Sequence, residues 1–249
     1  KKNNKFINYI DTHSGSGIYY YNDEYMAKNK EYLNGIDKLC KYNSEDKMVK
    51  YYIKTIKNIN KSNNLSFYPG SPKLMSFLSD SFDKLFFYEL NNNEIKLLKK
   101  NLSNISNSKI YHSDGFNFIK KTYNLKNQHI IFIDPSYEMK NDFDKVLYLL
   151  KEFDERYKNF TILIWYPIIQ KINNDIFIEN VRKVGLSDIL RVELPVLTYS
   201  DESGIKGSGL LIINSKKTLF SKLKLSIYEL YKALKHLNCI TKPKIQYLR

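Results

Sequence analysis

The chain has 249 residues, of which 43% are hydrophobic and 14% aromatic, and this composition excludes a disordered chain. No apolar run reaches the roughly 18 residues that a membrane-spanning helix needs, so a cytoplasmic protein without a membrane segment is expected. The net charge of +14 favours a polyanionic partner such as RNA or DNA, or an anionic membrane surface. A drift toward A/T-rich codons, which specify Lys, Asn and Ile, would explain part of the excess of lysine. Since the sequence begins "KKNNKF" without Met, we expect a further N-terminal segment before it.

The first part of the chain predicts one strand followed by helices. Residues 6–11 form a short apolar run that ends in an acid and leads into the Gly-rich loop "DTHSGSG". Apolar residues then recur at three- and four-residue spacing over 24–60, which predicts two or three helices. An extended piece follows, and a helix is expected over about 72–80, with Ser71 as its N-cap and Pro72 as its first residue.

The rest of the chain alternates strands with helices until the pattern changes near its end. Strand-like runs and helical stretches alternate at about 84–90, 91–103, 108–116, 115–123, 129–137, 142–157, 160–167 and 170–184. The runs at 187–198 and 207–215 are joined by a polar loop too short for a crossover helix, so they predict an antiparallel hairpin. A basic helix at about 217–237 and the tail "KPKIQYLR" close the chain.

This order of elements predicts an α/β fold with a mostly parallel, seven-stranded Rossmann-like sheet that ends in an antiparallel hairpin. Such a sheet fits a class I S-adenosylmethionine-dependent methyltransferase better than a dehydrogenase. We expect residues 1–21 and 66–249 to form this core and residues 22–65 to form an inserted helical subdomain.

Polar residues follow the first four predicted strands of the sheet, where ligands of open α/β sheets bind. They are Asp11 to Gly17, Glu89, the pair Asp114-Gly115, and Asp134 to Tyr137. One acid at a strand end is an ordinary turn former, but four such ends in register indicate a binding site.

Each of the first three polar strand ends has a ligand-binding interpretation and a structural one. In the first loop Gly15 suits a tight turn and a close backbone approach, while His13 either donates a hydrogen bond or charge to a carboxylate or is a structural residue. Glu89 either holds a ribose diol or precedes a helix as a favourable carboxylate. Asp114 either accepts from an adenine amino group or caps the next helix.

The separation of 89 − 17 = 72 residues between Glu89 and Gly17 exceeds the roughly 20 residues of a dinucleotide-binding fold. It requires an insertion, which the helical stretch supplies. His112, His129 and His236 fit no metal-ligand spacing, so no metal is expected.

The fourth strand end, "DPSY", has a composition that suits chemistry on an exocyclic amine. Such a nitrogen is a poor nucleophile, and methylating it requires acceptors for its N–H bonds in the transition state. Asp134 supplies a carboxylate, Pro135 a carbonyl held in a fixed direction, and Tyr137 a face on which a flipped base can stack.

The motif "DPSY" resembles the (D/N/S)-P-P-(Y/F/W) motif of amino-methyltransferases. Together with "DTHSGSG" and "FYPGSP" it is similar to the RlmJ family of ribosomal RNA large subunit methyltransferases. The resemblance implies S-adenosylmethionine as cofactor, 23S rRNA as partner, methylation of an adenine N6, and Asp134 as the catalytic acceptor. It also implies cofactor contacts from His13, Ser71, Glu89, Asp114 and Gly115. Gly15 is expected beside them from its place in the Gly-rich loop, where backbone can approach the cofactor. Ser136 departs from the motif, where the family has a second Pro, so loop rigidity and rate are in question.

Three alternatives to adenine methylation stay open from the sequence. Enzymes with related motifs methylate guanine N2 or the glutamine amide of a protein. A relative that binds RNA without catalysing a reaction would also carry the basic charge. The protein is expected to act as a monomer.

Overall fold

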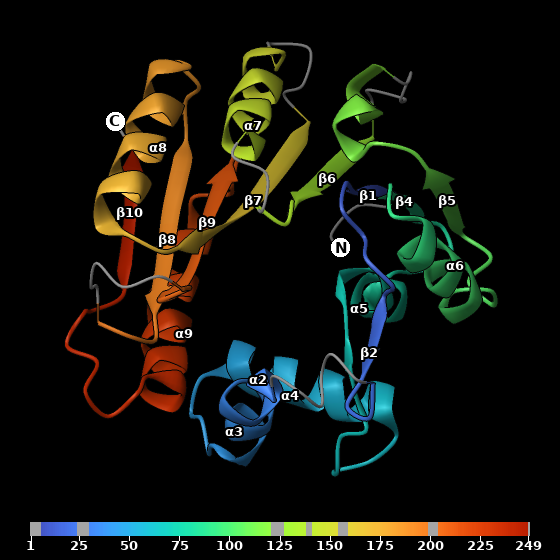
Figure 1. Ribbon diagram of the computed structural model, residues 1–249, viewed down its shortest axis with the longest axis horizontal. Coiled ribbons are helices and arrows are strands. Elements are labelled where there is room, and N and C mark those ends of the chain that lie inside the picture. Colours follow the sequence, from blue (N-terminus) through green and yellow to red (C-terminus); the bar gives the residue numbers. More distant parts are fainter. Residues whose placement is uncertain are drawn as a thin grey trace.

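The molecule is organised by one sheet of eight strands in the order β10-β8-β9-β7-β6-β1-β4-β5 (Figure 1). The structure, a computed structural model, describes residues 6–23, 30–120, 127–137, 141–153, 159–198 and 204–248. The strands are β1 (Ile7–Asp11), β4 (Lys84–Glu89), β5 (Ser108–His112), β6 (Gln128–Ile133), β7 (Phe160–Ile168), β8 (Ile189–Pro195), β9 (Gly207–Ile213) and β10 (Lys244–Leu248).

The strand directions confirm the predicted mostly parallel sheet and its closing hairpin. Strands β5, β4, β1, β6 and β7 run parallel, and β9 lies antiparallel between β7 and β8. All seven predicted strands are present. The tail adds an eighth strand, β10, which pairs antiparallel with β8. It does so because Ile245 and Leu248 pack into apolar clusters on the two faces of the sheet.

Helices cover both faces of the sheet because its strands are apolar on both sides. Adjacent residues Tyr9 and Ile10 of β1 enter different core clusters, one on each face. Helices α7 and α8 lie side by side over one face, while α6 and α9 pack on the other (Figure 1). The described helices of the core are α5 (Ser71–Leu78), α6 (Asn92–Asn101), α7 (Asp142–Lys151), α8 (Lys171–Lys183) and α9 (Thr218–Leu234).

The chain leaves the sheet after β1 and returns to it at β4. On the way β2 (Ile18–Tyr20) and β3 (Phe67–Pro69) pair antiparallel in a small second sheet. Between them come α2 (Glu31–Asn34), α3 (Ile36–Lys41) and α4 (Lys47–Asn60), in agreement with the two or three helices expected. Helices α3 and α4 pack against the end of α9, where Ile36, Val49 and Ala233 share one buried cluster.

Two local predictions were wrong in detail. Gly70, not Ser71, occupies the N-cap of α5, so the helix begins at Ser71 and Pro72 is its second residue. The stretch predicted as a helix after Asp114 is a 3₁₀ helix, η1 (Gly115–Lys120), and the remainder of that prediction lies outside the described residues. Residues 24–29 and 154–158 of two other predicted helices also lie outside them. None of the described helices is long and apolar enough to cross a membrane.

Candidate active site at the strand ends

The loops after β1, β4, β5 and β6 meet at the carboxyl ends of these strands and are joined by backbone hydrogen bonds. The amide of Thr12 donates to the carbonyl of Phe132 at 3.0 Å, and the amide of Ser14 donates to the carbonyl of Tyr88 at 2.9 Å. The amide of Ser113 likewise donates to the carbonyl of Glu89 at 3.1 Å. The structure therefore brings the four predicted strand ends together.

The Gly-rich loop depends on glycine at Gly15 and Gly17, whose φ angles are +57° and +74°. Residues with a Cβ atom rarely adopt this left-handed backbone conformation, so these positions favour glycine. The carbonyl of Gly17 accepts from the amide of Gly70 at 3.0 Å, which brings the start of α5 to the loop. Ser71, the first residue of α5, thereby comes next to Asp11, whose pKa it lowers through a hydrogen bond.

Glu89 links the Gly-rich loop to the first turn of α6. Its Oε2 accepts from the amide of Gly15 at 2.7 Å, and its Oε1 accepts from the amide of Asn91 at 2.7 Å. The carboxylate thus supports the loop as well as preceding the helix. Because a carboxylate has about four acceptor positions, Glu89 can still accept two hydroxyl groups.

Asp114 and Gly115 hold the loop after β5 against the loop after β1. Asp114 Oδ1 accepts from the amide of Phe116 at 2.9 Å, so the predicted capping interaction is present, on η1. A Cβ atom at Gly115 would clash with the backbone carbonyl of Thr12. Glycine is required here for close approach of two backbones, which the sequence did not reveal.

His13 lies in the Gly-rich loop as a neutral side chain. Burial lowers its pKa to about 4, because desolvation outweighs the nearby charges of Asp114 and Asp142. Its ring packs edge-on against Phe116 with centroids 4.9 Å apart, and its Nδ1 lies 2.7 Å from the Thr12 hydroxyl. At neutral pH these surroundings therefore favour the uncharged imidazole of His13. A hydrogen bond is still available to it.

Two carboxyl groups lie close together at the ends of neighbouring strands β1 and β6. Asp11 is fully buried, and burial raises its pKa to about 6 against the opposing hydrogen bonds from Ser71 and Tyr9. The pKa of Asp134 is raised to about 7, first by burial and then by the charge of Asp11. Asp11 stands at a strand end like the other acids, but its place in the sequence alone predicts no separate role for it.

The residues after Asp134 form a strained, packed loop. Pro135 is buried and Ser136 is exposed, while Tyr137 has a φ of +55°, which is uncommon for a residue with a side chain. The Tyr137 hydroxyl donates to the carbonyl of Trp165 at 2.6 Å, and its ring centroid lies 4.5 Å from that of Phe143. Part of the face predicted to stack on a base is thus occupied by packing.

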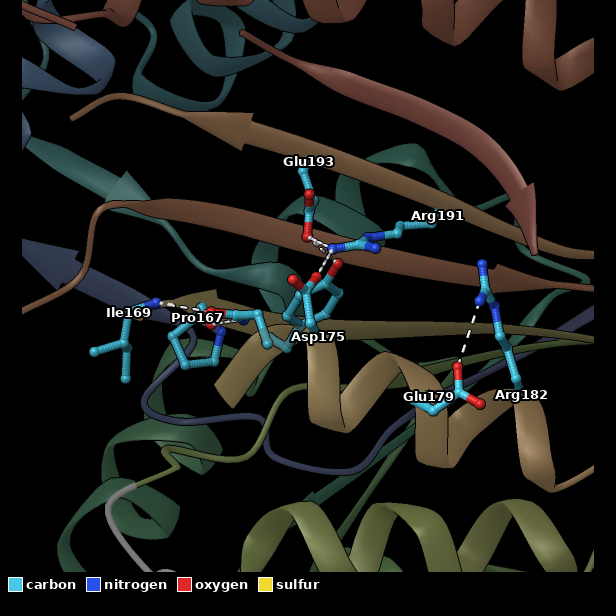
Figure 2. Close-up of polar contacts among 9 residues, drawn as sticks. Pro167, Ile169, Asp175, Glu179, Arg182, Arg191 and Glu193 are labelled. Atoms are coloured by element: carbon cyan, nitrogen blue, oxygen red, sulfur yellow. Dashed lines mark hydrogen bonds and ion pairs between the residues drawn. The ribbon is translucent and has the colours of Figure 1, made fainter. Parts of the chain in front are cut away.

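The end of β7, which carries Trp165, is held by buried polar contacts that sequence reasoning missed (Figure 2). Asn174 of α8 donates to the carbonyl of Pro167 at 2.8 Å and accepts from the amide of Ile169 at 3.2 Å. Nearby, Arg191 and Glu193 of β8 form an ion pair at 2.7 Å. Asn174 thus fixes the chain where β7 ends.

The strand order, with antiparallel β9 between β7 and β8 and polar loops at the carboxyl ends of the parallel strands, defines the class I methyltransferase fold. The family model described as "Ribosomal RNA large subunit methyltransferase D, RlmJ" matches residues 4–237. The chain therefore belongs to the RlmJ family of ribosomal RNA large subunit methyltransferases, as its motifs predicted.

Individual relatives agree with this assignment. The chain is 32% identical over 215 residues to ribosomal RNA large subunit methyltransferase J of Escherichia coli strain K12, a match covering 86% of this chain and 77% of that protein. The protein of the same name from Haemophilus influenzae is 32% identical over 218 residues, covering 87% and 78%. A crystal structure of a Legionella pneumophila protein superposes with a TM-score of 0.84 at 29% identity, covering 98% of this chain and 90% of that one.

Proposed function

We propose that this protein transfers a methyl group from S-adenosylmethionine to the N6 amine of an adenine in 23S rRNA. The observation that carries the proposal is the placement of Asp134 at the end of β6, beside Asp11 and directly before a buried Pro. An acceptor in this position suits an amine that must lose a proton as it gains a methyl group. Membership of the RlmJ family supports rRNA as the substrate class.

The chemistry assigned to Asp134 is acceptance of an N–H bond from the target nitrogen. Hydrogen bonds from the amine to Asp134 and to the carbonyl of Pro135 favour the tetrahedral nitrogen of the transition state. As the new C–N bond forms, the bond between the methyl carbon and the sulfonium sulfur would break and leave a neutral thioether. The nitrogen thereby becomes positively charged and then loses one proton, which the carboxylate accepts. Tyr137 limits where the base can lie, because its own ring is fixed by the hydrogen bond to Trp165.

The residues assigned to the cofactor surround Asp11 and the Gly-rich loop. Bound S-adenosylmethionine supplies the electrophilic methyl group. We assign its binding to His13, Gly15, Ser71, Glu89, Asp114 and Gly115. The carboxylates fit its hydroxyl and amino groups, and the first turn of α5 at Ser71 fits its carboxylate, because helix N-termini favour anions. Neutral His13 contributes a hydrogen bond in this scheme.

The proposal extends to the setting of the protein. We propose that residues 22–65 act as an inserted subdomain of the methyltransferase core, and that a monomer acts in the cytoplasm, where ribosomal RNA is modified. Light scattering of the purified protein, alone and with RNA, tests the monomer.

A direct test incubates the purified full chain with labelled S-adenosylmethionine and unmodified 23S rRNA transcript, followed by nucleoside analysis. The expected product is N6-methyladenine. Label in N2-methylguanine, or transfer to protein in place of RNA, would contradict the proposal. Absence of transfer together with intact cofactor and RNA binding would indicate a relative that only binds RNA.

A further inference from the structure

One face of α4 carries a row of lysines that the strand-end site does not use. Lys50, Lys54 and Lys57 follow one another at four- and three-residue spacing, which places them on one side of the helix, and Lys61 is the C-cap that follows it. From Lys50 to Lys57 the helix rises roughly 10 Å. Like charges at this spacing repel and destabilise a helix, so solvation alone is a poor reason for gathering them.

A groove lies along this row, between α4 and α3. It has a volume of about 490 Å³, and we call it the α3–α4 groove. Its walls include Lys41 and Asn43 from α3 and the loop after it, and Lys50, Lys54, Lys57 and Asn58 from α4. The two walls are close together, since the charge of Lys57 acts on the thiol of Cys40 in α3 and partly offsets the burial that raises the pKa of that thiol.

The positive charge of the groove is not neutralised from within. Among the residues that the structure describes, Lys41, Lys50, Lys54 and Lys57 take part in no ion pair. The nearby acids are engaged elsewhere: Asp46 caps α4 through the amides of Met48 and Val49, and Asp37 accepts from the hydroxyl of Tyr21. Four ammonium groups with amide donors between them match a run of phosphates, which accept from both.

The segment that forms the groove is inserted into the chain at the end of the sheet that carries the candidate active site. The chain enters this segment from the Gly-rich loop through β2 and leaves it through β3 into Ser71, so both connections start at the strand ends. Figure 1 shows α3 and α4 together beside α9, away from α7 and α8. An RNA strand that places one nucleotide at Asp134 can therefore extend toward α4.

We propose that the α3–α4 groove binds the phosphate backbone of the RNA substrate and so holds the strand whose base enters the strand-end site. This rests on the proposed function and adds to it the surface that gives affinity without reading sequence. Phosphate contacts of this kind position a nucleic acid and make its binding depend on salt.

The test compares two triple variants of the full chain with the wild type. Lys50, Lys54 and Lys57 are changed to Gln in the groove variant, and Lys96, Lys99 and Lys100 of α6 in the control variant. Both sets are exposed or half-buried lysines on helices, and both changes remove three charges. Glutamine keeps the helix propensity of lysine, and circular dichroism checks that both variants fold.

The measured quantity is the dissociation constant for 23S rRNA transcript over a series of KCl concentrations. The groove variant should bind at least about tenfold more weakly at physiological salt, and the slope of log K against log salt should fall in magnitude by about 2. The control variant should stay within about twofold of the wild type. Cofactor affinity should be unchanged in both, and replacing the same three groove lysines by Arg should restore RNA binding.

Two results overturn the groove assignment while leaving the proposed function intact. One is wild-type RNA affinity and slope in the groove variant of an enzyme that methylates rRNA. The other is an equal loss in both variants, which would assign the effect to net charge. Failure of the wild type to methylate RNA, with the salt slope still dependent on the groove, would instead reject the proposed function.

Discussion

Asp11 in the parallel half of the sheet and Glu193 in the antiparallel half are both buried carboxyl groups, but their surroundings differ. Glu193 accepts from Arg191 at 2.7 Å and from the Tyr166 hydroxyl at 2.9 Å. Within the described residues Asp11 has no cation at ion-pair distance, and Asp134 lies close enough for its pKa to be raised by Asp11. A cation beside a buried carboxyl group favours its charged form, whereas burial without a cation raises the pKa, as it does at Asp11 and Asp134.

Replacing Asp134 by Ala gives the largest effect expected from this comparison. The variant removes the oxygen that accepts the N–H bond of the target amine, so turnover should fall by about 10²–10⁴-fold. Single-turnover transfer to 23S rRNA measures this, with calorimetry to check that S-adenosylmethionine still binds within a few-fold. Undiminished turnover would remove Asp134 from its proposed role.

Removing Arg191 breaks the buried ion pair between Arg191 and Glu193. Arg191→Met leaves Glu193 buried without its cation, which should lower the free energy of unfolding by about 3–5 kcal/mol and Tm by roughly 10 °C. Thermal unfolding followed by circular dichroism measures the change. In the matched control, R191M combined with E193L and Y166F removes all three polar groups and should regain most of the loss. No recovery would mean that Arg191 acts through packing.

The pH dependence of the reaction sharpens the comparison. Because the pKa of Asp134 is raised to about 7, kcat/KM should rise with pH and reach only about a tenth of its plateau at pH 6. Asp11→Asn removes the neighbouring negative charge, so the midpoint should move to lower pH, whatever the plateau. Rates measured from pH 5 to 9 test this, and an unmoved midpoint would show that the two carboxyl groups do not interact.

The smallest expected effect is on stability. The pKa of Asp134 is near 4 in the unfolded chain and about 7 in the folded protein. Ionisation of Asp134 therefore lowers the free energy of unfolding as the pH rises from about 4 to about 7, and the loss is complete above pH 7. Asp134→Asn should therefore raise Tm by a few degrees at pH 8 and leave it unchanged at pH 4. An equal rise at both pH values would point to a cause other than ionisation.

Most of the site could be predicted from sequence because it is built at strand ends. The runs that end in Asp11, Glu89 and Asp134 are short and apolar, so their termini are visible without a structure, and parallel strands bring such termini together. Class and family followed from the motifs that stand at these positions.

The remaining features depend on contacts between distant residues. The close approach of Gly115 to Thr12 and the hydrogen bond from Gly15 to Glu89 form only after the loops meet. The charge state of His13 is set by burial, which its sequence neighbours do not report. The sequence predicts only a tail where β10 lies, because the pairing of β10 with β8 joins segments that are far apart in the sequence.

Strand β10 also affects the tendency of the sheet to pair edge to edge with another copy of the molecule. A strand at the margin of a sheet exposes unpaired amide and carbonyl groups, which invite pairing with another chain. Strand β8, which is buried along nearly its whole length, would be such a margin, and β10 covers it. The last strand places Lys244 and Gln246 there instead, with Tyr247 stacked on Phe220 of α9 at 5.6 Å. A chain shortened before Lys244 would consequently be prone to aggregate.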